Sequence, residues 1–395
     1  MPSQLTQSEF DLLQVNNGSW ERPTTNPIGG ALNDDITSAL EILGNNGHDR
    51  LTGTNVLLQL INGGAGSDQI YGLGGQDNIN GGDGNDFIEG GSGGSAILRE
   101  VLNGNDGIDT LSYEHSTAAV TIDLHLGTGG NILLATGGDA QFDTVKATFE
   151  NLVGSAYNDI LTGNNGANVI FGLAGDDTIA GGLGNNKLHG GDGNDMLIVQ
   201  SIGDAVDGGA GIDTVEFEYP FGLSASVDLL TANNMTTVEN LIGTPQTLGS
   251  GSDILRGNDV VNSISGMSGN DIIEGRGGSD VLSGGSSSPV ADDNDVFVYS
   301  DADVTTAIDR ITDFGFVANN DDKINLSAID ANSGVAGDQA FTFIGTNVAF
   351  YGVAQVRYNS SAHEVEANVN AVLSADLKIH FDNNPATMSA ADFVL

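Results

Sequence analysis

The chain has no cysteine and very little positive charge. Among its 395 residues there are 11 lysines and arginines against 53 aspartates and glutamates, so the net charge at pH 7 is -42. Disulfide cross-links are therefore excluded. So acidic a chain repels phosphates, and neither nucleic acid nor an anionic membrane is an expected partner. It also repels itself, and we expect it to fold poorly unless cations neutralise it.

Long apolar runs are missing as well. Apolar patches such as residues 56–58 are far shorter than the roughly 20 residues of a membrane span, so no span is expected. Met1 begins no basic segment followed by an apolar stretch, so we expect no Sec-type signal peptide.

Glycine, in contrast, is abundant, with 58 residues, and it recurs at a fixed spacing. Many segments fit a unit of nine residues: glycine, glycine, any residue, glycine, any residue, aspartate, any residue, a large apolar residue, any residue. The best run covers residues 63–71, 72–80 and 81–89, and a decaying copy follows at 90–98. So regular a period indicates a repeat architecture.

Each unit divides into a turn and a strand. The glycine-rich first six residues reach backbone angles that other residues avoid, which predicts a tight turn with exposed carbonyl groups. The last three form a short strand whose central apolar residue points inward. In the best run these inward residues are Ile70, Ile79, Ile88 and Ile97.

Two units would make one full coil, so residues 18 apart in sequence would lie one strand spacing apart, about 4.8 Å. Asp68 would then stack on Asp86. Two carboxylates at that spacing repel each other, but the spacing is about twice a calcium–oxygen distance of roughly 2.4 Å. A calcium ion therefore fits between them, with turn carbonyls completing its oxygen shell.

These repeats resemble those of the RTX (repeats-in-toxin) family, and the resemblance covers most of residues 44–298. It implies an all-β fold, a parallel β-roll or β-helix solenoid filled with several calcium ions and exported by bacterial type I secretion. The implied calcium ligands are the aspartates at the sixth position of a repeat or its equivalent. They are Asp68, Asp77, Asp86, Asp109, Asp159, Asp177, Asp195, Asp213, Asp253, Asp271, Asp280 and Asp295.

Substitutions at the sixth position predict which sites are weak. In residues 154–198 aspartate alternates with asparagine, in the order Asp159, Asn168, Asp177, Asn186 and Asp195. Alternate units lie on opposite edges of the roll, and a neutral amide oxygen binds calcium weakly. We therefore predict calcium along one edge and hydrogen-bonded amides along the other. The same defect is expected where Asp280 faces Asn262 and where Asp77 faces Ser95.

Four regions are expected. Residues 1–43 lack the repeat, carry a weak helical pattern around Ile36, and are interpreted as a cap; 44–112 form the first β-roll. Residues 113–298 hold two further β-roll blocks with inserted β modules. An internal duplication supports that division, since residues 107–111, 120–124 and 149–154 recur as 211–215, 226–230 and 238–243.

The fourth region, residues 299–395, contains no nonapeptide and has the alternating pattern of a β-rich domain. The segments 295–299, 309–314 and 322–327 resemble the C-terminal module of serralysin-type secreted proteins. The last residues, from Ser389 to Leu395, resemble that family's uncleaved type I secretion signal, an acidic residue followed by apolar ones. Met1 and this ending lead us to expect a whole chain.

Serralysins are zinc proteases, but the zinc motif HExxH is not complete here. His363 and Glu364 supply its first half, and no second histidine follows. His115 and His125 share one insert and are a weak candidate for a metal pair. Most carboxylates sit in calcium-type positions and are not free to act as a glycosidase pair. We expect no enzymatic activity.

The first hypothesis is a secreted, extracellular bacterial protein without enzymatic activity that binds calcium and folds when it meets calcium outside the cell. Its expected partners are calcium, the type I secretion apparatus and a cell-surface, matrix or glycan ligand. The alternative is the export and folding part of a secreted protease, lipase or alginate epimerase, whose catalytic part the sequence does not contain. A pore-forming toxin would need an apolar segment that is missing.

Overall fold

The computed structural model describes residues 35–37, 41–55, 58–93, 99–125, 131–132, 135–219, 224–230, 235–245, 251–285, 294–317 and 320–395. The chain forms two compact units, Met1–Asp213 and Thr214–Leu395. Among the described residues the regular structure is strand, apart from short 3-10 helices, and most strand pairs are parallel. This confirms the predicted all-β parallel roll.

The first unit contains three parallel ladders. One has the order β1 (Asp35–Thr37), β3 (Arg50–Thr52), β5 (Gln69–Tyr71), β7 (Phe87–Glu89), β9 (Thr110–Ser112), β14 (Asn151–Val153), β16 (Val169–Ala174), β18 (Lys187–Asp192) and β20 (Ala205–Ala210). Facing it is β2 (Glu41–Asn46), β4 (Leu60–Ala65), β6 (Asn78–Asp83), β8 (Val101–Asp106), β13 (Thr144–Lys146) and the antiparallel β11 (Asn131–Ile132). The third is β12 (Ala135–Thr136), antiparallel to β10 (Thr121–Asp123), then β15 (Ile160–Thr162), β17 (Thr178–Ala180) and β19 (Met196–Val199), and η1 (Gly138–Ala140) precedes β13.

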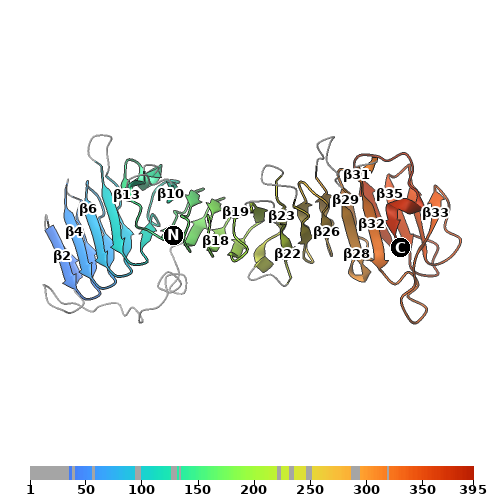
Figure 1. Cartoon of the computed structure of the whole chain (residues 1–395), viewed down its shortest axis with the longest axis horizontal. Helices are drawn as coiled ribbons and strands as arrows, with labels where there is room; N and C mark the ends of the chain where they lie inside the picture. Colours follow the sequence, from blue (N-terminus) through green and yellow to red (C-terminus); the bar gives the residue numbers. More distant parts are fainter. Residues whose placement is uncertain are drawn as a thin grey trace. The chain divides into compact units, whose positions relative to one another are not determined.

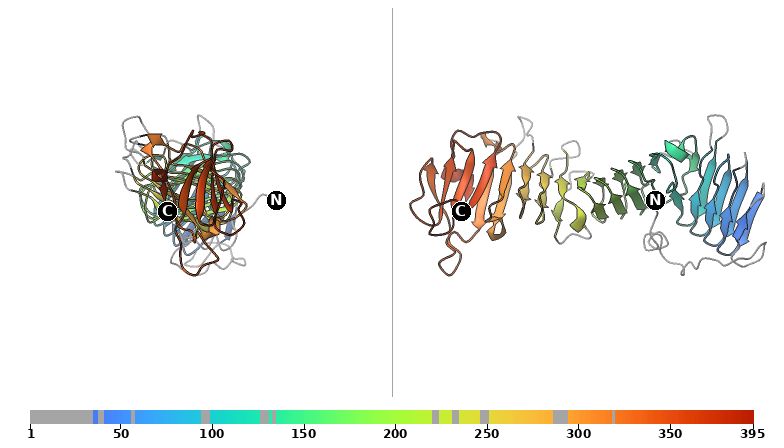
Figure 2. Two further views of the ribbon diagram at one scale, coloured as in Figure 1. Left: turned by 90° about the vertical axis from the view of Figure 1, so that its right-hand side faces the viewer. Right: turned by 180° about the vertical axis from the view of Figure 1, so that it is seen from behind.

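In Figure 1 the strands β2, β4 and β6 lie side by side in blue, and Figure 2 shows the same stack from behind. Ile70 pairs with Ile88, as the two-unit coil predicts, and both are fully buried, like Ile79. Ile97 lies outside the described residues. The partner of Ile79 is Leu102, because this coil contains five more residues than the regular one.

The weak helical pattern near the N-terminus was wrong for the described residues. Ile36 lies in strand β1 and Leu43 in strand β2. Strand β1 pairs with β3 and strand β2 pairs with β4, so ladder pairing overrides the local helical pattern.

The strands of the second unit lie in two ladders. One runs β21 (Thr214–Phe217), β23 (Asn240–Ile242), β25 (Ser263–Ser265), β27 (Val281–Ser283), β29 (Ile308–Ile311), β36 (Leu377–Phe381), β35 (Glu364–Asn368), β34 (Gln355–Asn359) and β33 (Thr342–Thr346). The other runs β22 (Ser226–Asp228), β24 (Ile254–Arg256), β26 (Ile272–Glu274), β28 (Val296–Ser300), β32 (Lys323–Ala328) and β37 (Phe393–Val394). A small hairpin joins β30 (Phe316–Val317) to β31 (Asn320–Asp321), and the 3-10 helices are η3 (Met235–Thr237), η5 (Asp301–Asp303) and η6 (Ala390–Asp392).

The region after residue 298 continues the repeat ladder. Strand β28 spans that position, and its next partner is β32, while β29 pairs with β27 on one side and β36 on the other. The strand character expected for the C-terminal region is confirmed in β33, β34 and β36. The fourfold division of the chain stays a prediction.

Candidate calcium ladder

Several turns between strands contain glycines at places where a side chain does not fit. Gly64 and Gly82 have φ of +111 and +120 degrees, and a Cβ on Gly82 would lie 1.9 Å from the carbonyl oxygen of Gly64. Side chains are excluded on both counts, because positive φ is costly for other residues and the next coil occupies the space. The turns of successive coils therefore stack backbone against backbone.

The sixth-position side chains form rows that run from coil to coil. In the first aspartate row, defined as Asp49, Asp68, Asp86, Asp109 and Glu150, each backbone N–H donates to the carboxylate of the next member. The distance is 2.8 Å from Asp49 to Asp68, 2.8 Å from Asp68 to Asp86 and 2.9 Å from Asp86 to Asp109. Each carboxylate thus holds two coils in register with one oxygen, and the predicted stacking of Asp68 on Asp86 is confirmed.

The second carboxylate oxygen lies over the first glycine of its own turn. Where a Cβ of Gly63 would stand, Oδ2 of Asp68 is 2.2 Å away and the carbonyl oxygen of Gly81 is 2.5 Å away. These two oxygens belong to adjacent coils. They converge on a space that is open only because Gly63 has no side chain. The same cradle recurs at Gly172 and Gly190, with Asp177 and Asp195.

Several of these second oxygens are buried and accept no hydrogen bond. They belong to Asp68, Asp77, Asp86, Asp109, Asp177, Asp195 and Asp280. A buried carboxylate oxygen without a donor is costly. A hard cation that takes several oxygen ligands would remove the cost, and carboxylates with carbonyl groups are the donor set that calcium prefers. The residues present therefore fit calcium.

The pKa values of the row aspartates reflect the same cost of burying carboxylates. Burial raises the pKa of Asp68 and Asp109 to about 7 and that of Asp86 to about 8, and neighbouring carboxylates add to the rise. Burial also raises the pKa of Asp177 to about 8. Backbone hydrogen bonds offset only part of this effect. Without a cation, the ionised form of the row aspartates is therefore disfavoured by burial and by repulsion between neighbouring carboxylates.

The opposite edges of coils 154–213 differ as predicted. The second aspartate row, Asp159, Asp177, Asp195 and Asp213, repeats the carboxylate pattern at 2.7 to 2.9 Å. In the amide row, Asn168, Asn186 and Asp204, the Nδ2 of Asn168 donates to the carbonyl of Glu150, and that of Asn186 donates to Gly182 at 3.2 Å. The expected hydrogen-bonded amides are confirmed, and calcium occupancy of either edge stays a prediction.

The second unit carries a third aspartate row and a mixed one. Asp253, Asp271, Asp295 and Asp322 are linked at 2.7 to 2.9 Å, and Asn262, Asp280 and Asp309 at 2.8 to 2.9 Å. Asn262 and Asp280 are neighbours along one edge, as expected for the weak calcium site that they were predicted to share. Burial raises the pKa of Asp280 and Asp309 to about 7.

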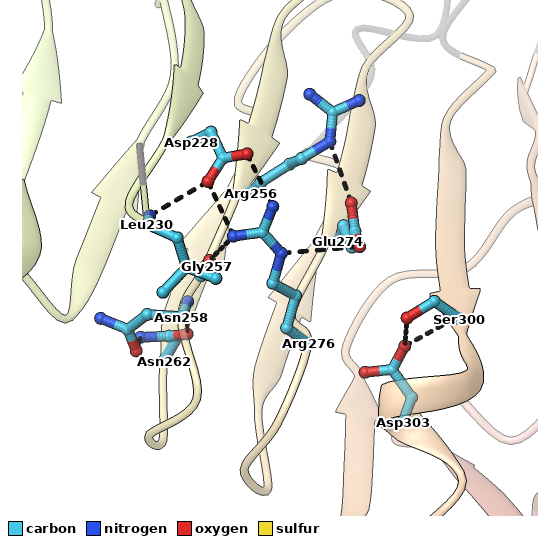
Figure 3. Close-up of polar contacts among 10 residues, drawn as sticks. All are labelled: Asp228, Leu230, Arg256, Gly257, Asn258, Asn262, Glu274, Arg276, Ser300 and Asp303. Atoms are coloured by element: carbon cyan, nitrogen blue, oxygen red, sulfur yellow. Dashed lines mark hydrogen bonds and ion pairs between the residues drawn. The ribbon is translucent and has the colours of Figure 1, made fainter. Parts of the chain in front are cut away.

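An arginine replaces a glycine beside this mixed row. Arg276 takes the second position of its turn with φ of 66 degrees, and its guanidinium donates to both carboxylate oxygens of Asp228 at 2.7 Å and to the carbonyl of Gly257 at 2.8 Å (Figure 3). The hydrogen bonds from Arg276 hold the pKa of Asp228 below its usual value. A fixed positive charge therefore joins three coils here.

Sequence reasoning missed several members of the rows. Asp49, Glu100, Asp143, Glu150, Asp204, Asp309 and Asp322 occupy sixth-position places but were not predicted as ligands. They share a short signal, an acidic residue two positions before a buried apolar one, without the full glycine pattern of the repeat. Ser95, expected opposite Asp77, lies outside the described residues. The N–H that donates to the carbonyl of Asp77 belongs to Val101, directly after Glu100.

The histidines are placed separately from these rows. His115 Nδ1 lies 2.8 Å from Glu89 and 3.7 Å from Glu114, an ion pair at the edge of the inserted module. The hydrogen bond that His115 donates to Glu89 raises the pKa of His115. His363 precedes β35, where Glu364 pairs with Lys378 at 2.8 Å. That strand does not provide the helix that an HExxH zinc site requires.

Comparison with known proteins agrees with the geometry. Four copies of the RTX calcium-binding nonapeptide repeat match the chain, at residues 62–95, 147–179, 171–198 and 256–288. No curated protein matches the chain. Among the residues that the structure describes, no helix has the length and hydrophobicity needed to cross a membrane. The chain thus carries RTX calcium-binding repeats, and calcium is the ion that they indicate.

Proposed function

We propose that this protein is a secreted calcium-binding protein without enzymatic activity, exported through a type I apparatus and folded by extracellular calcium. Its task outside the cell is binding to a surface, a matrix or a glycan. The observation that carries the proposal is the repeated cradle in which Asp68 Oδ2 and the carbonyl oxygen of Gly81 converge over Gly63. The matching RTX repeats support the same ion.

Folding and binding are one process in this proposal. Calcium would be held by the carboxylates of one row and the turn carbonyls of adjacent coils, and it would supply the positive charge that the rows lack. Each coil buries its apolar residue only against a neighbouring coil, so closing one turn favours the next. The free energy of calcium binding therefore becomes free energy of folding.

The last residues of the chain support export before folding. Phe393 is buried and lies in β37, which pairs with β32, while the Asp392 side chain accepts a hydrogen bond from the N–H of Ser389 at 2.6 Å. In the folded protein this segment is built into a ladder. A secretion signal located there would have to be read from the unfolded chain, as expected in a cytosol poor in calcium.

The test is a calcium titration of the chelated protein followed by circular dichroism, with magnesium as the control. We expect the chelated protein to keep only part of its β structure and to gain the rest cooperatively between roughly 0.1 and 1 mM calcium, the range of extracellular calcium modules. Magnesium should not replace it, because it demands a tighter octahedral shell. A chelated protein that is already folded and indifferent to calcium would refute the proposal.

A further inference from the structure

A histidine and two glutamates from adjacent coils of the first unit converge on one point. Glu89 is the last residue of β7, and Glu114 and His115 follow β9, which pairs with β7. One side-chain ligand atom from each of the three residues lies within 4.8 Å of the other two. None of them belongs to an aspartate row, and the group does not include His125, the expected partner of His115.

The backbone holds two of these side chains in a closed turn. Residues 113–116 contain Glu114 and His115, and the N–H of Ser116 donates to the carbonyl of the first turn residue at 2.9 Å. Oγ of Ser116 accepts a hydrogen bond from the N–H of Asp139, in η1, at 3.0 Å. The turn is therefore fixed by its own hydrogen bond and by the following part of the inserted module.

Glu89 is the buried member of the group, with 5% of its surface exposed. Its Oε1 accepts from the backbone N–H of His115 at 3.2 Å, and its Oε2 lies 2.8 Å from Nδ1 of the same residue. Asp139 interacts electrostatically with both Glu89 and His115, and Glu114 lies on the other side of the imidazole. One imidazole thus faces three carboxylates. A divalent cation would offset more of their charge than the single proton of an imidazolium.

The spacing of the ligand atoms fits a transition metal. Zinc binds imidazole nitrogen and carboxylate oxygen at roughly 2.0 to 2.2 Å, so two neighbouring ligands of one ion lie roughly 3.2 Å apart. Nδ1 of His115 is 2.8 Å from Oε2 of Glu89 and 3.7 Å from Oε1 of Glu114, on either side of that value. Calcium instead takes roughly six to eight oxygen ligands, and this group offers a nitrogen at its centre.

We propose that Glu89, Glu114 and His115 form a binding site for a divalent transition metal of the zinc type, separate from the calcium rows. Nδ1 of His115 would bind the ion after losing its proton, together with one carboxylate oxygen from each glutamate. The His115 side chain is 48% exposed, so an ion can enter and water can take the remaining positions. The ion would fasten the inserted module to the coil of β7. This inference goes beyond the proposed function, because it concerns another ion.

The first experiment counts metal ions per chain by native mass spectrometry, which separates zinc from calcium by mass. The protein is saturated with calcium and then given an equal amount of zinc chloride. We expect one zinc ion in the unmodified protein and none in H115Q, with the same number of calcium ions in both. The matched control is H125Q, the same substitution at an exposed histidine of the same insert, which should keep its zinc.

Two outcomes of this count would overturn the site: equal zinc in H115Q and the unmodified protein, or no zinc in either. The first would place zinc elsewhere, and the second would leave the contact of His115 with Glu89 as an ion pair only. Absence of calcium from the unmodified protein would instead refute the proposed function.

A second measurement uses the unmodified protein, which keeps the proposal testable if H115Q does not fold. Diethyl pyrocarbonate modifies a nitrogen of neutral imidazole, and an imidazole bound to a metal reacts more slowly. In saturating calcium, added zinc should protect His115 and leave the exposed His125 as reactive as before, as measured by mass spectrometry of peptides. Equal modification of His115 with and without zinc would contradict the site.

Discussion

The second aspartate row and the amide row lie on opposite edges of the same coils and share the step of 18 residues from coil to coil. Their backbone hydrogen bonds are alike, since the N–H of Asp159 donates to Asp177 at 2.7 Å and that of Asn168 donates to Asn186 at 3.0 Å. What differs is the second side-chain atom. In Asp177 it is a buried oxygen without a donor, and in Asn186 it is an NH₂ group.

This difference shows how the protein solves one electrostatic problem in two ways. Turn carbonyls point toward both edges and require a positive partner. On the amide row that partner is the Nδ2 of the asparagine itself, which donates to Gly182 and to Oδ1 of Asp204. Oδ2 of Asp177 and Oδ2 of Asp195 have no such donor, so their partner must come from solution. The amide row is expected to be stable without calcium and the aspartate rows with it.

Acidity should separate the rows most strongly, because many aspartates respond together while the asparagines do not titrate. In the calcium-free protein the pKa of Asp177 is raised from 3.8 to about 8, and that of Asp195 to about 6. A raised folded pKa stabilises the fold below the unfolded pKa, and this stabilisation is lost as pH rises through the folded value. We expect the chelated protein to melt at a clearly higher temperature at pH 5 than at pH 8.5.

Thermal unfolding in chelator, followed by circular dichroism across that range, checks this expectation. Saturating calcium serves as the control, since bound cations should flatten or reverse the trend. A melting temperature that does not change with pH in chelator would show that the pKa values of the row aspartates do not differ between the folded and the unfolded protein.

D177N turns one rung of the aspartate row into an amide rung. In calcium the ion between coils would lose a charged ligand, and we expect a loss of about 3 kcal/mol, comparable to breaking a buried ion pair. In chelator the same substitution removes a buried carboxylate and should be neutral or stabilising. Urea unfolding in both conditions measures the change of sign. Equal destabilisation in both would point to packing and not to an ion.

The regular parts of this comparison follow from the sequence. The step of 18 residues from Asp159 to Asp177 reflects an unbroken pair of nonapeptides, so both the register and the alternation of Asp and Asn could be predicted. The backbone there is determined locally, by glycines in the turn and one apolar residue in the strand.

The irregular coils could not be predicted in the same way. Asp86 is followed in its row by Asp109 after 23 residues, and Asp109 by Glu150 after 41. Such inserts keep the ladder but break the period, so only tertiary pairing identifies the next member. Arg276 is similar, because its partner Asp228 lies 48 residues away and no local pattern connects them.

N186D makes the reverse change, from amide to carboxylate. It removes the donor to Gly182 and places a second charge beside Asp204, so in chelator we expect a loss of about 2 kcal/mol. Calcium should restore part of this loss, because the substituted amide row then resembles the second aspartate row. Unfolding at increasing calcium concentration measures the recovery. A loss that calcium does not relieve would show that this edge lacks the geometry for an ion.

D204N repeats the chemical change of D177N at the end of the amide row and should have the smallest effect. Oδ1 of Asp204 accepts from the N–H of Asn186 at 2.8 Å and from its Nδ2 at 3.0 Å, and an asparagine oxygen can keep both bonds. The charge assistance and the long hydrogen bond from the N–H of Ser201 to Oδ2, at 3.3 Å, are lost, which costs about 1 kcal/mol. The calcium count should not change. If D204N lowered the calcium count, the edge with the amide row would bind calcium as well, and the Nδ2 of Asn186 would not take the place of a cation there.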